Sequence, residues 1–266
     1  MSFLEIILLA IVQGLTEFLP VSSSGHLVVA NAILESLGSA PVKDLVEVEI
    51  VLHLGTLASV LVYYRREIAR LFTSDRRVIP LLIVGTIPAA VLGILIKKGL
   101  PDTATDFILQ SPLVAGVCFP ITGALLWWTT KCPEGKTDYT KLNWSGTLKI
   151  GVLQAFALLP GISRSGATIA AGLGVGLQRE SAATFAFLLA IPAIAGGGLL
   201  ELLEALEAGS TNTPLATLAA GFALSFIVGL GALALLIHWV RQGRLALFAY
   251  YLVPLGAAVI AWQFFA

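Results

Sequence analysis

The stretch "VQGLTEFLPVSSSGH", residues 12–26, places strongly polar side chains among the apolar residues of a membrane segment. It contains Gln13, Glu17, three serines and His26. Ionisable groups within a membrane are costly and usually mark functional sites. Pro20 interrupts the segment as well, because a proline disfavours helix in the residue before it. The stretch therefore predicts a broken helix that carries a polar site.

The rest of the chain has the composition of a membrane protein. Of its 266 residues, 57% are hydrophobic and only 12% are charged, whereas soluble domains have about 25% charged residues. Apolar runs of about 20 residues recur, which suits helices that cross a bilayer core about 30 Å thick. We expect a single integral membrane domain over residues 1–266, an all-α polytopic membrane protein. The net charge of zero implies no nucleic-acid partner.

Six apolar segments are long enough to cross the bilayer. Two other regions, 2–38 and 147–177, are apolar but are broken by prolines, glycines and hydroxyl residues. Broken helices are tolerated at membrane depth only where protein or a water-filled cavity surrounds them. We expect these two regions to be helical hairpins, and the six spans to lie at 44–64, 78–97, 107–130, 182–207, 214–240 and 245–265.

Basic residues predict the orientation. Lysines and arginines gather in 65–77 and 131–149, and Arg179, Arg241 and Arg244 mark two further loops. Cytoplasmic loops are enriched in these residues, so all four segments are placed inside. The hairpin at 147–177 then enters from the cytoplasm and returns there, and the first hairpin has both ends outside. This arrangement gives six transmembrane helices plus two opposed re-entrant helical hairpins.

The two hairpins resemble each other. "QGLTEFLPVSSSG" at 13–25 parallels "QAFALLPGISRSG" at 154–166, and three spans follow each of them. Two copies of opposite orientation form an inverted repeat, here about 1–130 and about 147–266. Such folds place their site near the midplane, where the broken helices meet. The alternative is a chance similarity between two apolar segments that contain proline and serine.

The first hairpin offers a carboxylate, hydroxyls and an imidazole. Gln13 and Glu17 are four residues apart and share one face of a helix. Ser22 or Ser23 suits a helix N-cap, and the first-turn amides then favour an anion. His26 lies on the same side and can act as general acid, general base or nucleophile. Glu17, with Gln13, is also a candidate ligand for a divalent cation that bridges phosphate oxygens.

The second hairpin, "PGISRSGAT" at 160–168, adds Arg164. An arginine at membrane depth costs ~3 kcal/mol or more, so a partner must offset it. That partner is either a buried carboxylate such as Glu17 or an anionic ligand, and the planar guanidinium suits phosphate. A purely structural ion pair is the alternative. The surrounding serines could equally be structural, because hydroxyls in membrane helices often bond backbone or a neighbouring helix.

Together these groups suit phosphoryl transfer, in which catalysis is mainly positioning and charge stabilisation. In one scheme Ser23 attacks phosphorus while His26 or Glu17 handles protons, and in the other His26 attacks. His53, in an otherwise apolar span, is interpreted as a packing or helix-contact residue. The candidate catalytic residues are Ser23, His26, Glu17 and Arg164, and the candidate substrate-binding residues are Gln13, Ser22, Ser24, Ser163, Ser165, Gly166 and Thr168.

The motifs "QGLTEFLPVSSSGH" and "LPGISRSGAT" resemble those of the undecaprenyl-pyrophosphate phosphatase family, the bacitracin-resistance type, and "LHLGTLASVLVYYRR" at 52–66 extends the match. The resemblance implies hydrolysis of undecaprenyl pyrophosphate to undecaprenyl phosphate and inorganic phosphate. This reaction recycles the lipid carrier for peptidoglycan synthesis and confers bacitracin resistance.

The resemblance also implies a place and a cofactor. The place is the bacterial inner membrane, with the site opening toward the outer, periplasmic side, and the cofactor is a divalent cation, Mg²⁺ or Ca²⁺. Carried over, Gln13 and Glu17 form the acidic-motif pair, Ser23 and His26 the catalytic pair, and Arg164 holds the pyrophosphate. Position 13 is a glutamine, which weakens any metal site that needs two carboxylates.

A secondary transporter of a small anion, or a flippase for the same lipid, is the rival hypothesis, because inverted repeats with broken helices suit it equally well. A histidine three residues after a serine favours chemistry over transport. The sequence leaves a homodimer open.

Overall fold

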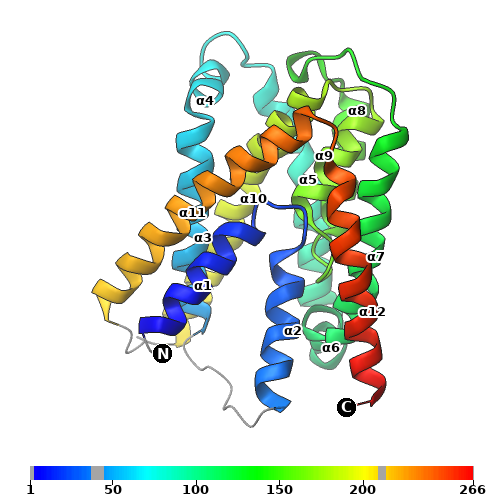
Figure 1. Cartoon of the computed structure of the whole chain (residues 1–266). Coiled ribbons are helices and arrows are strands. Elements are labelled where there is room, and N and C mark those ends of the chain that lie inside the picture. The colour runs from blue at the N-terminus through cyan, green and yellow to red at the C-terminus, as the bar shows by residue number, and fades with distance from the viewer. Residues whose placement is uncertain (1–2, 37–44, 209–213, 266) are drawn as a thin grey trace.

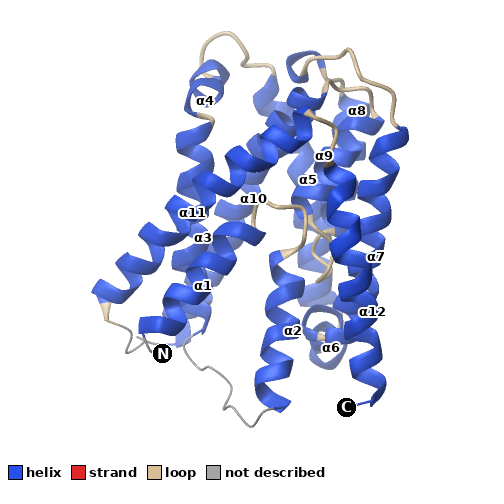
Figure 2. Cartoon of the chain, viewed as in Figure 1, coloured by secondary structure: helices blue, strands red, loops and turns tan. Residues whose placement is uncertain are grey.

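The structure, a computed structural model, describes residues 3–36, 45–208 and 214–265. The described residues form helices and connecting loops, and no β-strand (Figures 1 and 2). In chain order the helices are α1 (Phe3–Thr16), α2 (Ser23–Ser36), α3 (Leu45–Tyr63), α4 (Arg65–Leu71), α5 (Val78–Gly99), α6 (Asp102–Gln110), α7 (Pro112–Trp128), α8 (Trp144–Phe156), α9 (Arg164–Gly174), α10 (Arg179–Ala208), α11 (Leu215–Arg241) and α12 (Ala249–Phe265). Short 3₁₀ turns occur at Thr129–Lys131, Tyr139–Lys141 and Leu245–Phe248.

Among the described residues, five helical stretches are long and apolar enough to cross a membrane. They are Val78–Gly99, Pro112–Lys131, Arg179–Leu199, Leu215–Arg241 and Leu245–Phe265. A sixth is formed if α3 and α4, which are bent by 75° at Tyr64, count as one span. The prediction of an all-α polytopic membrane protein is confirmed at this level.

The predicted span at 107–130 is wrong at its start. The helix α6 ends at Gln110, and the spanning helix begins only at Pro112. Ser111 caps it, because its side chain accepts a hydrogen bond from the backbone N–H of Val114 at 3.5 Å. A serine cap followed by a proline in the first turn is a strong start signal, and it divides an apolar run that hydropathy alone joins.

Two pairs of short helices turn back on themselves inside the molecule. The helices α1 and α2 are joined by the turn at 17–22, and α8 and α9 by the turn at 157–163. In Figure 1 the first pair extends from the end that carries both chain termini, and the second pair from the opposite end. The two turns meet near the middle of the fold.

Each half of the chain packs its first helix against a helix of the other half. Helix α1 packs against α11, and α8 packs in the same manner against α5. The helices α3 and α11 pack together, as do α7 and α12. This reciprocal exchange holds the two turns against each other.

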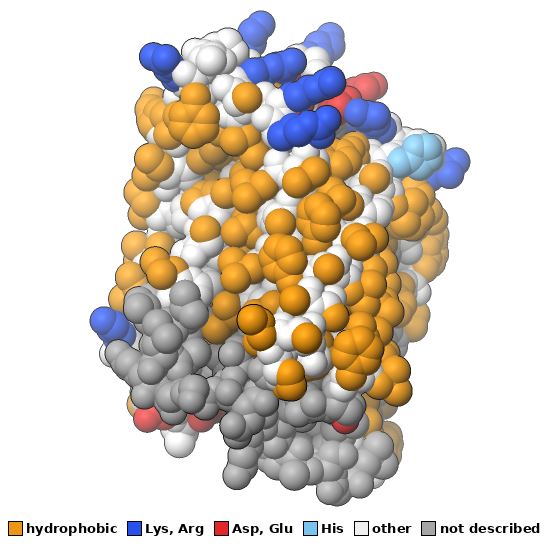
Figure 3. Space-filling model, turned by 90° about the vertical axis from the view of Figure 1, so that its left-hand side faces the viewer, with side chains coloured by type: hydrophobic (Ala, Val, Ile, Leu, Met, Phe, Trp, Pro, Cys, Tyr) orange, Lys and Arg blue, Asp and Glu red, His pale blue; other side chains and the backbone are white. Residues whose placement is uncertain are grey.

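The surface has the character of a membrane protein. Figure 3 shows a broad band of hydrophobic side chains below an end where most of the visible lysines and arginines gather. Large apolar side chains such as Ile83, Ile94 and Ile227 are 56–63% exposed. Lipid contact, rather than water, suits such a surface, because a soluble monomer rarely exposes so large an apolar area.

Candidate active site

The first turn is held by packing on one side and by hydroxyl bonds on the other. Phe18 is fully buried and packs edge-on against Phe187 of α10, with ring centroids 5.8 Å apart. Ser22 has φ of 70°, the one positive φ at a non-glycine position in the part of the chain that the structure describes. Its Oγ accepts a hydrogen bond from the N–H of Gly25 at 3.3 Å. Ser22 is therefore the N-cap of α2.

The second turn has a matching cap. Ser163 accepts a hydrogen bond from the N–H of Gly166 at 3.2 Å and so caps α9. Thr122 of α7 donates to the carbonyl of Gly161 at 2.8 Å and accepts from the N–H of Ser163 at 3.2 Å. The irregular backbone of a buried turn needs such internal partners, because an unpaired buried N–H or C=O group is costly.

The two turns are in direct contact. The N–H of Gly161 donates to Ser22 Oγ at 3.0 Å. A Cβ placed on Gly25 would lie 2.6 Å from Gly161 N, so no larger residue fits at position 25. Gly161 itself has φ of 93°, a conformation that glycine adopts without strain. Hairpins separated by about 140 residues therefore share one small polar centre.

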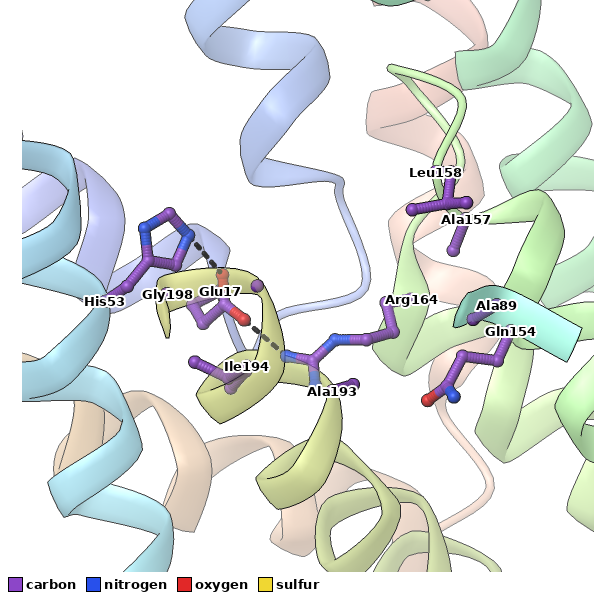
Figure 4. A pocket seen from close by; sticks show the side chains of 11 residues that line it. Glu17, His53, Ala89, Gln154, Ala157, Leu158, Arg164, Ala193, Ile194 and Gly198 are labelled. Carbon is purple, nitrogen blue, oxygen red and sulfur yellow. Dashed lines mark hydrogen bonds and ion pairs between the residues drawn. The ribbon is translucent and has the colours of Figure 1, made fainter. Parts of the chain in front are cut away.

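Glu17 is the hub of this centre. One carboxylate oxygen, Oε1, accepts a hydrogen bond from Arg164 Nη2, and the two side chains form an ion pair (Figure 4). The other oxygen, Oε2, accepts from Gln13 Nε2 at 3.1 Å and from Ser23 Oγ at 3.2 Å. Four of the sequence-predicted residues, Gln13, Glu17, Ser23 and Arg164, are thus brought together.

His53 of α3 also faces Glu17, a contact that no spacing in the sequence indicates. Its Nδ1 lies 2.9 Å from the carbonyl oxygen of Glu49 and must carry the proton, since a carbonyl only accepts. Its Nε2 lies 3.8 Å from Glu17 Oε2 (Figure 4). Its interpretation as a packing or helix-contact residue did not name Glu17 as the partner, because the packing of α3 beside the first turn is set by tertiary structure.

His26 lies on the other side of the first turn. Its Nδ1 donates to the carbonyl of Ser22 at 2.7 Å, and its Nε2 accepts from the hydroxyl of Tyr251 at 2.7 Å. The ring stacks on Tyr251 and meets the edge of Phe119, with centroids 5.8 and 5.1 Å away. His26 lines neither of the two cavities beside Glu17, so its catalytic role stays a prediction.

Two cavities adjoin at the Glu17–Arg164 pair, and both are lined by Glu17, Ala157 and Arg164. The first, about 140 Å³, is lined mainly by hydroxyl side chains, those of Thr16, Ser22, Ser23, Ser24 and Ser163. The second, about 210 Å³, is lined by His53, Gln154 and apolar residues. We call them the serine cavity and the second cavity.

The other predicted residues support α9. Ser165 Oγ lies 3.1 Å from Ser163 Oγ, and Thr168 donates to the carbonyl of Arg164 at 2.8 Å. Gly166 supplies the capping amide, and a Cβ there would lie 3.2 Å from the Cβ of Pro20. These three are structural neighbours of Arg164 and do not line either cavity.

The residues at the centre do not form a metal site of their own. Both oxygens of Glu17 already accept hydrogen bonds, one of them from an arginine. No group of three histidine, cysteine, aspartate or glutamate side chains close enough to hold an ion occurs in the described ranges. Mg²⁺ and Ca²⁺ prefer several oxygen ligands, and among the residues that line the two cavities Glu17 is the one carboxylate.

Fold and site together define a class: a multi-pass helical membrane protein whose polar centre is built from the turns of two opposed helix pairs. The chain belongs to the family described as "Bacitracin resistance protein BacA", whose sequence model matches residues 6–258.

Three relatives, each named undecaprenyl-diphosphatase, are similar to this chain over nearly their whole length. The protein of Rhodopirellula baltica is 45% identical over 260 residues, which is 97% of both chains. That of Korarchaeum cryptofilum is 40% identical over 98% of this chain and 99% of its own. That of Alkaliphilus metalliredigens is 38% identical over 99% of both.

Proposed function

We propose that this chain is an undecaprenyl-diphosphatase, a hydrolase that acts on a phosphoric anhydride. It converts undecaprenyl pyrophosphate to undecaprenyl phosphate and inorganic phosphate, which recycles the lipid carrier for peptidoglycan synthesis and confers bacitracin resistance. The observation that carries the proposal is the convergence of Ser23 and Arg164 on the carboxylate of Glu17. A hydroxyl with an adjacent base is an activated nucleophile, and an arginine beside it suits phosphate.

In the proposed reaction Ser23 Oγ attacks the terminal phosphorus while Glu17 takes its proton. The bond between that phosphorus and the bridging oxygen breaks, and polyprenyl phosphate leaves. Water then hydrolyses the phosphoserine and releases inorganic phosphate. Arg164 and the first-turn amides of α2 and α9 stabilise the negative charge. The hydrogen bond from Ser23 to Glu17 supports Glu17 as the proton acceptor.

His26 fits a positioning role better than an attacking one in this arrangement. Both of its ring nitrogens are engaged, one by the Ser22 carbonyl and one by Tyr251. The scheme in which His26 is the nucleophile requires the ring to leave both partners. We therefore assign the attack to Ser23.

We further propose the arrangement in the membrane: six spans and two opposed re-entrant hairpins, α1–α2 and α8–α9, in an inverted repeat. The end that carries α4 is rich in lysine and arginine, so it is placed in the cytoplasm. The α1–α2 pair then opens toward the outer side of the bacterial inner membrane. The family resemblance implies the same side for the site.

We propose that a divalent cation, Mg²⁺ or Ca²⁺, binds only together with the pyrophosphate. Glu17 is engaged by protein donors, so no step is assigned to a metal here. Calorimetric titration of the lipid-free protein with Mg²⁺ should give no binding at micromolar concentration. A tight stoichiometric site without lipid would contradict this assignment.

Phosphate release from farnesyl pyrophosphate by the detergent-purified protein tests the function. An enzyme still works without a sealed compartment, whereas a transporter releases nothing. Ser23→Ala should lower the turnover at least about 100-fold, a loss of the size that follows removal of one catalytic group. Arg164→Lys should also be nearly inactive compared with the wild type, because lysine keeps the charge but lacks the two-pronged donor of the guanidinium.

Two controls make these results decisive. Both variants should elute and melt like the wild type in detergent, which separates lost chemistry from lost folding. Normal turnover by a folded Ser23→Ala protein would remove the serine scheme. The absence of phosphate release by the wild type would favour the transporter hypothesis and overturn the proposed function.

A further inference from the structure

Two residues that line the second cavity each have a buried polar atom with no hydrogen-bond partner among the described residues. These atoms are Nη1 of Arg164 and Oε1 of Gln154. Gln154 is only 3% exposed, and its Nε2 donates to the carbonyl of Gly85 at 3.4 Å. Because a carbonyl only accepts, this bond fixes the amide orientation and leaves the oxygen for another group. A buried polar atom without a partner costs ~1–3 kcal/mol, so a ligand that supplies one is favoured.

The ligand must meet two demands at once. It needs an oxygen that accepts from Arg164 Nη1 and a hydroxyl that donates to Gln154 Oε1. A singly protonated phosphate group offers both. The site of phosphoryl transfer lies next to it, since Arg164 and Glu17 line this cavity as well as the serine cavity.

Most of the remaining wall of the second cavity is apolar. Ala89 of α5 and Ala193 and Ile194 of α10 line it, together with Gly197 and Gly198 (Figure 4). A Cβ placed on Gly197 or Gly198 would meet no atom within 4 Å, so the cavity is open beside them. A polar end and an apolar wall fit an amphiphile whose head is a phosphate.

The in-line geometry of phosphoryl transfer indicates which phosphate group binds in the second cavity. In phosphoryl transfer the attacking and leaving oxygens lie roughly in line on opposite sides of phosphorus. Ser23 lines only the serine cavity, and Arg164 borders both. A phosphoryl group bound at Arg164 and attacked by Ser23 therefore has the second cavity available for its leaving group.

We propose that the second cavity binds the polyprenyl phosphate leaving group. Its phosphate lies between Arg164 and Gln154, and its first isoprene units follow Ala193 and Ile194. The chain enters the bilayer past Gly197 and Gly198. This inference rests on the proposed function and adds to it the direction in which the lipid lies.

Gly198→Leu tests the path of the chain. Leucine is a better helix former than glycine, and space is free at this position, so the variant should fold. Its side chain should obstruct the exit and raise KM for farnesyl pyrophosphate about tenfold, or ~1.4 kcal/mol. Gly196→Leu is the matched control: it lies on the same helix with equally free surroundings but does not line the cavity. Its KM should stay within about twofold of the wild type.

Gln154→Met tests the phosphate site, because methionine keeps the length of the side chain and removes the oxygen. Inhibition by farnesyl monophosphate should weaken about tenfold, while inhibition by inorganic phosphate should change little. If inhibition by inorganic phosphate weakens instead, the cavity holds the released phosphate and the proposal is wrong. Equal KM values for the Gly198→Leu and Gly196→Leu proteins would also overturn it. In all these cases the wild type still releases phosphate, so the proposed function survives.

Discussion

Ser23 and Arg164 occupy equivalent positions after the two turns. Each is the first residue of a helix, each follows a serine cap bonded to a glycine amide three residues on, and each donates to Glu17. One turn thus supplies a hydroxyl and the other a cation. The carboxylate between them offsets the cost of burying the arginine and keeps both donors close together.

Part of this centre followed from spacing alone. The pairing of Arg164 with Glu17 was among the alternatives that the sequence offered, because an arginine in a membrane segment needs a partner. The cap at Ser22 was another, because it depends on local helix chemistry. The contact of His53 did not follow, since it depends on how α3 packs. The direction of the His26 ring did not follow either, since it is set by Tyr251, 225 residues away.

At Ser22 we predict two separable effects. Ser22→Ala and Ser22→Gly both remove the oxygen that accepts from Gly25 and Gly161, so both should lower activity and melting temperature in detergent. Only glycine relieves the strain of φ at 70°, so Ser22→Gly should be the more stable of the two by about 1 kcal/mol. The reverse order would show that this backbone conformation carries no strain.

At the scale of elements, the short helices are what bring polar groups to the middle of the fold. The helices α1 and α8 have 14 and 13 residues, fewer than the ~20 that a span needs. Their ends therefore fall inside the molecule, as the interrupted sequence predicted. The predicted start of the span at 107 failed for the converse reason: apolar residues of α6 continued the hydropathy run past a real helix boundary.

The contact between α8 and α5 places Gln154. A Cβ on Gly151 would lie 2.5 Å from the carbonyl oxygen of Gly85, so Gly151→Ala should push α8 away from α5. We expect a lower melting temperature and lower activity, although alanine favours helix over glycine by about 1 kcal/mol. Gly231→Ala is the control, since Gly231 is helical with free space around it. Its melting temperature should be equal or higher, and equal losses in both variants would contradict the packing argument.

At the scale of the molecule, the site belongs to neither half alone. Glu17 and Ser23 come from the first half and Arg164 from the second, and the exchange of α1 and α8 between halves brings them together. The sequence indicated two similar halves but not which helices exchange. Lipid tails are as apolar as leucine, so hydrophobic patterning does not select helix partners in a membrane; close packing of small residues does.

One polar contact of Asp138, which lies outside the candidate membrane spans, holds α10 to the 132–143 connection and should make stability depend on pH. Asp138 Oδ1 accepts from the N–H and hydroxyl of Thr140 at 2.9 and 2.7 Å, and Oδ2 accepts from Ser181 of α10 at 3.1 Å. Burial alone would raise the pKa of Asp138, but these hydrogen bonds, aided by Lys141, outweigh it and hold the pKa below its ordinary value. The charged form is thus favoured in the folded protein.

A lowered carboxyl pKa adds stability that is fully present above the unfolded value of about 3.9 and is lost as the pH falls through the folded pKa. Asp138→Asn should therefore melt below the wild type at pH 7, and the difference should shrink as the pH falls below about 4 toward the folded pKa. Thermal melts in detergent across this range check it. Parallel curves for the two proteins would mean that the Asp138 charge contributes nothing to holding α10 against the 132–143 connection.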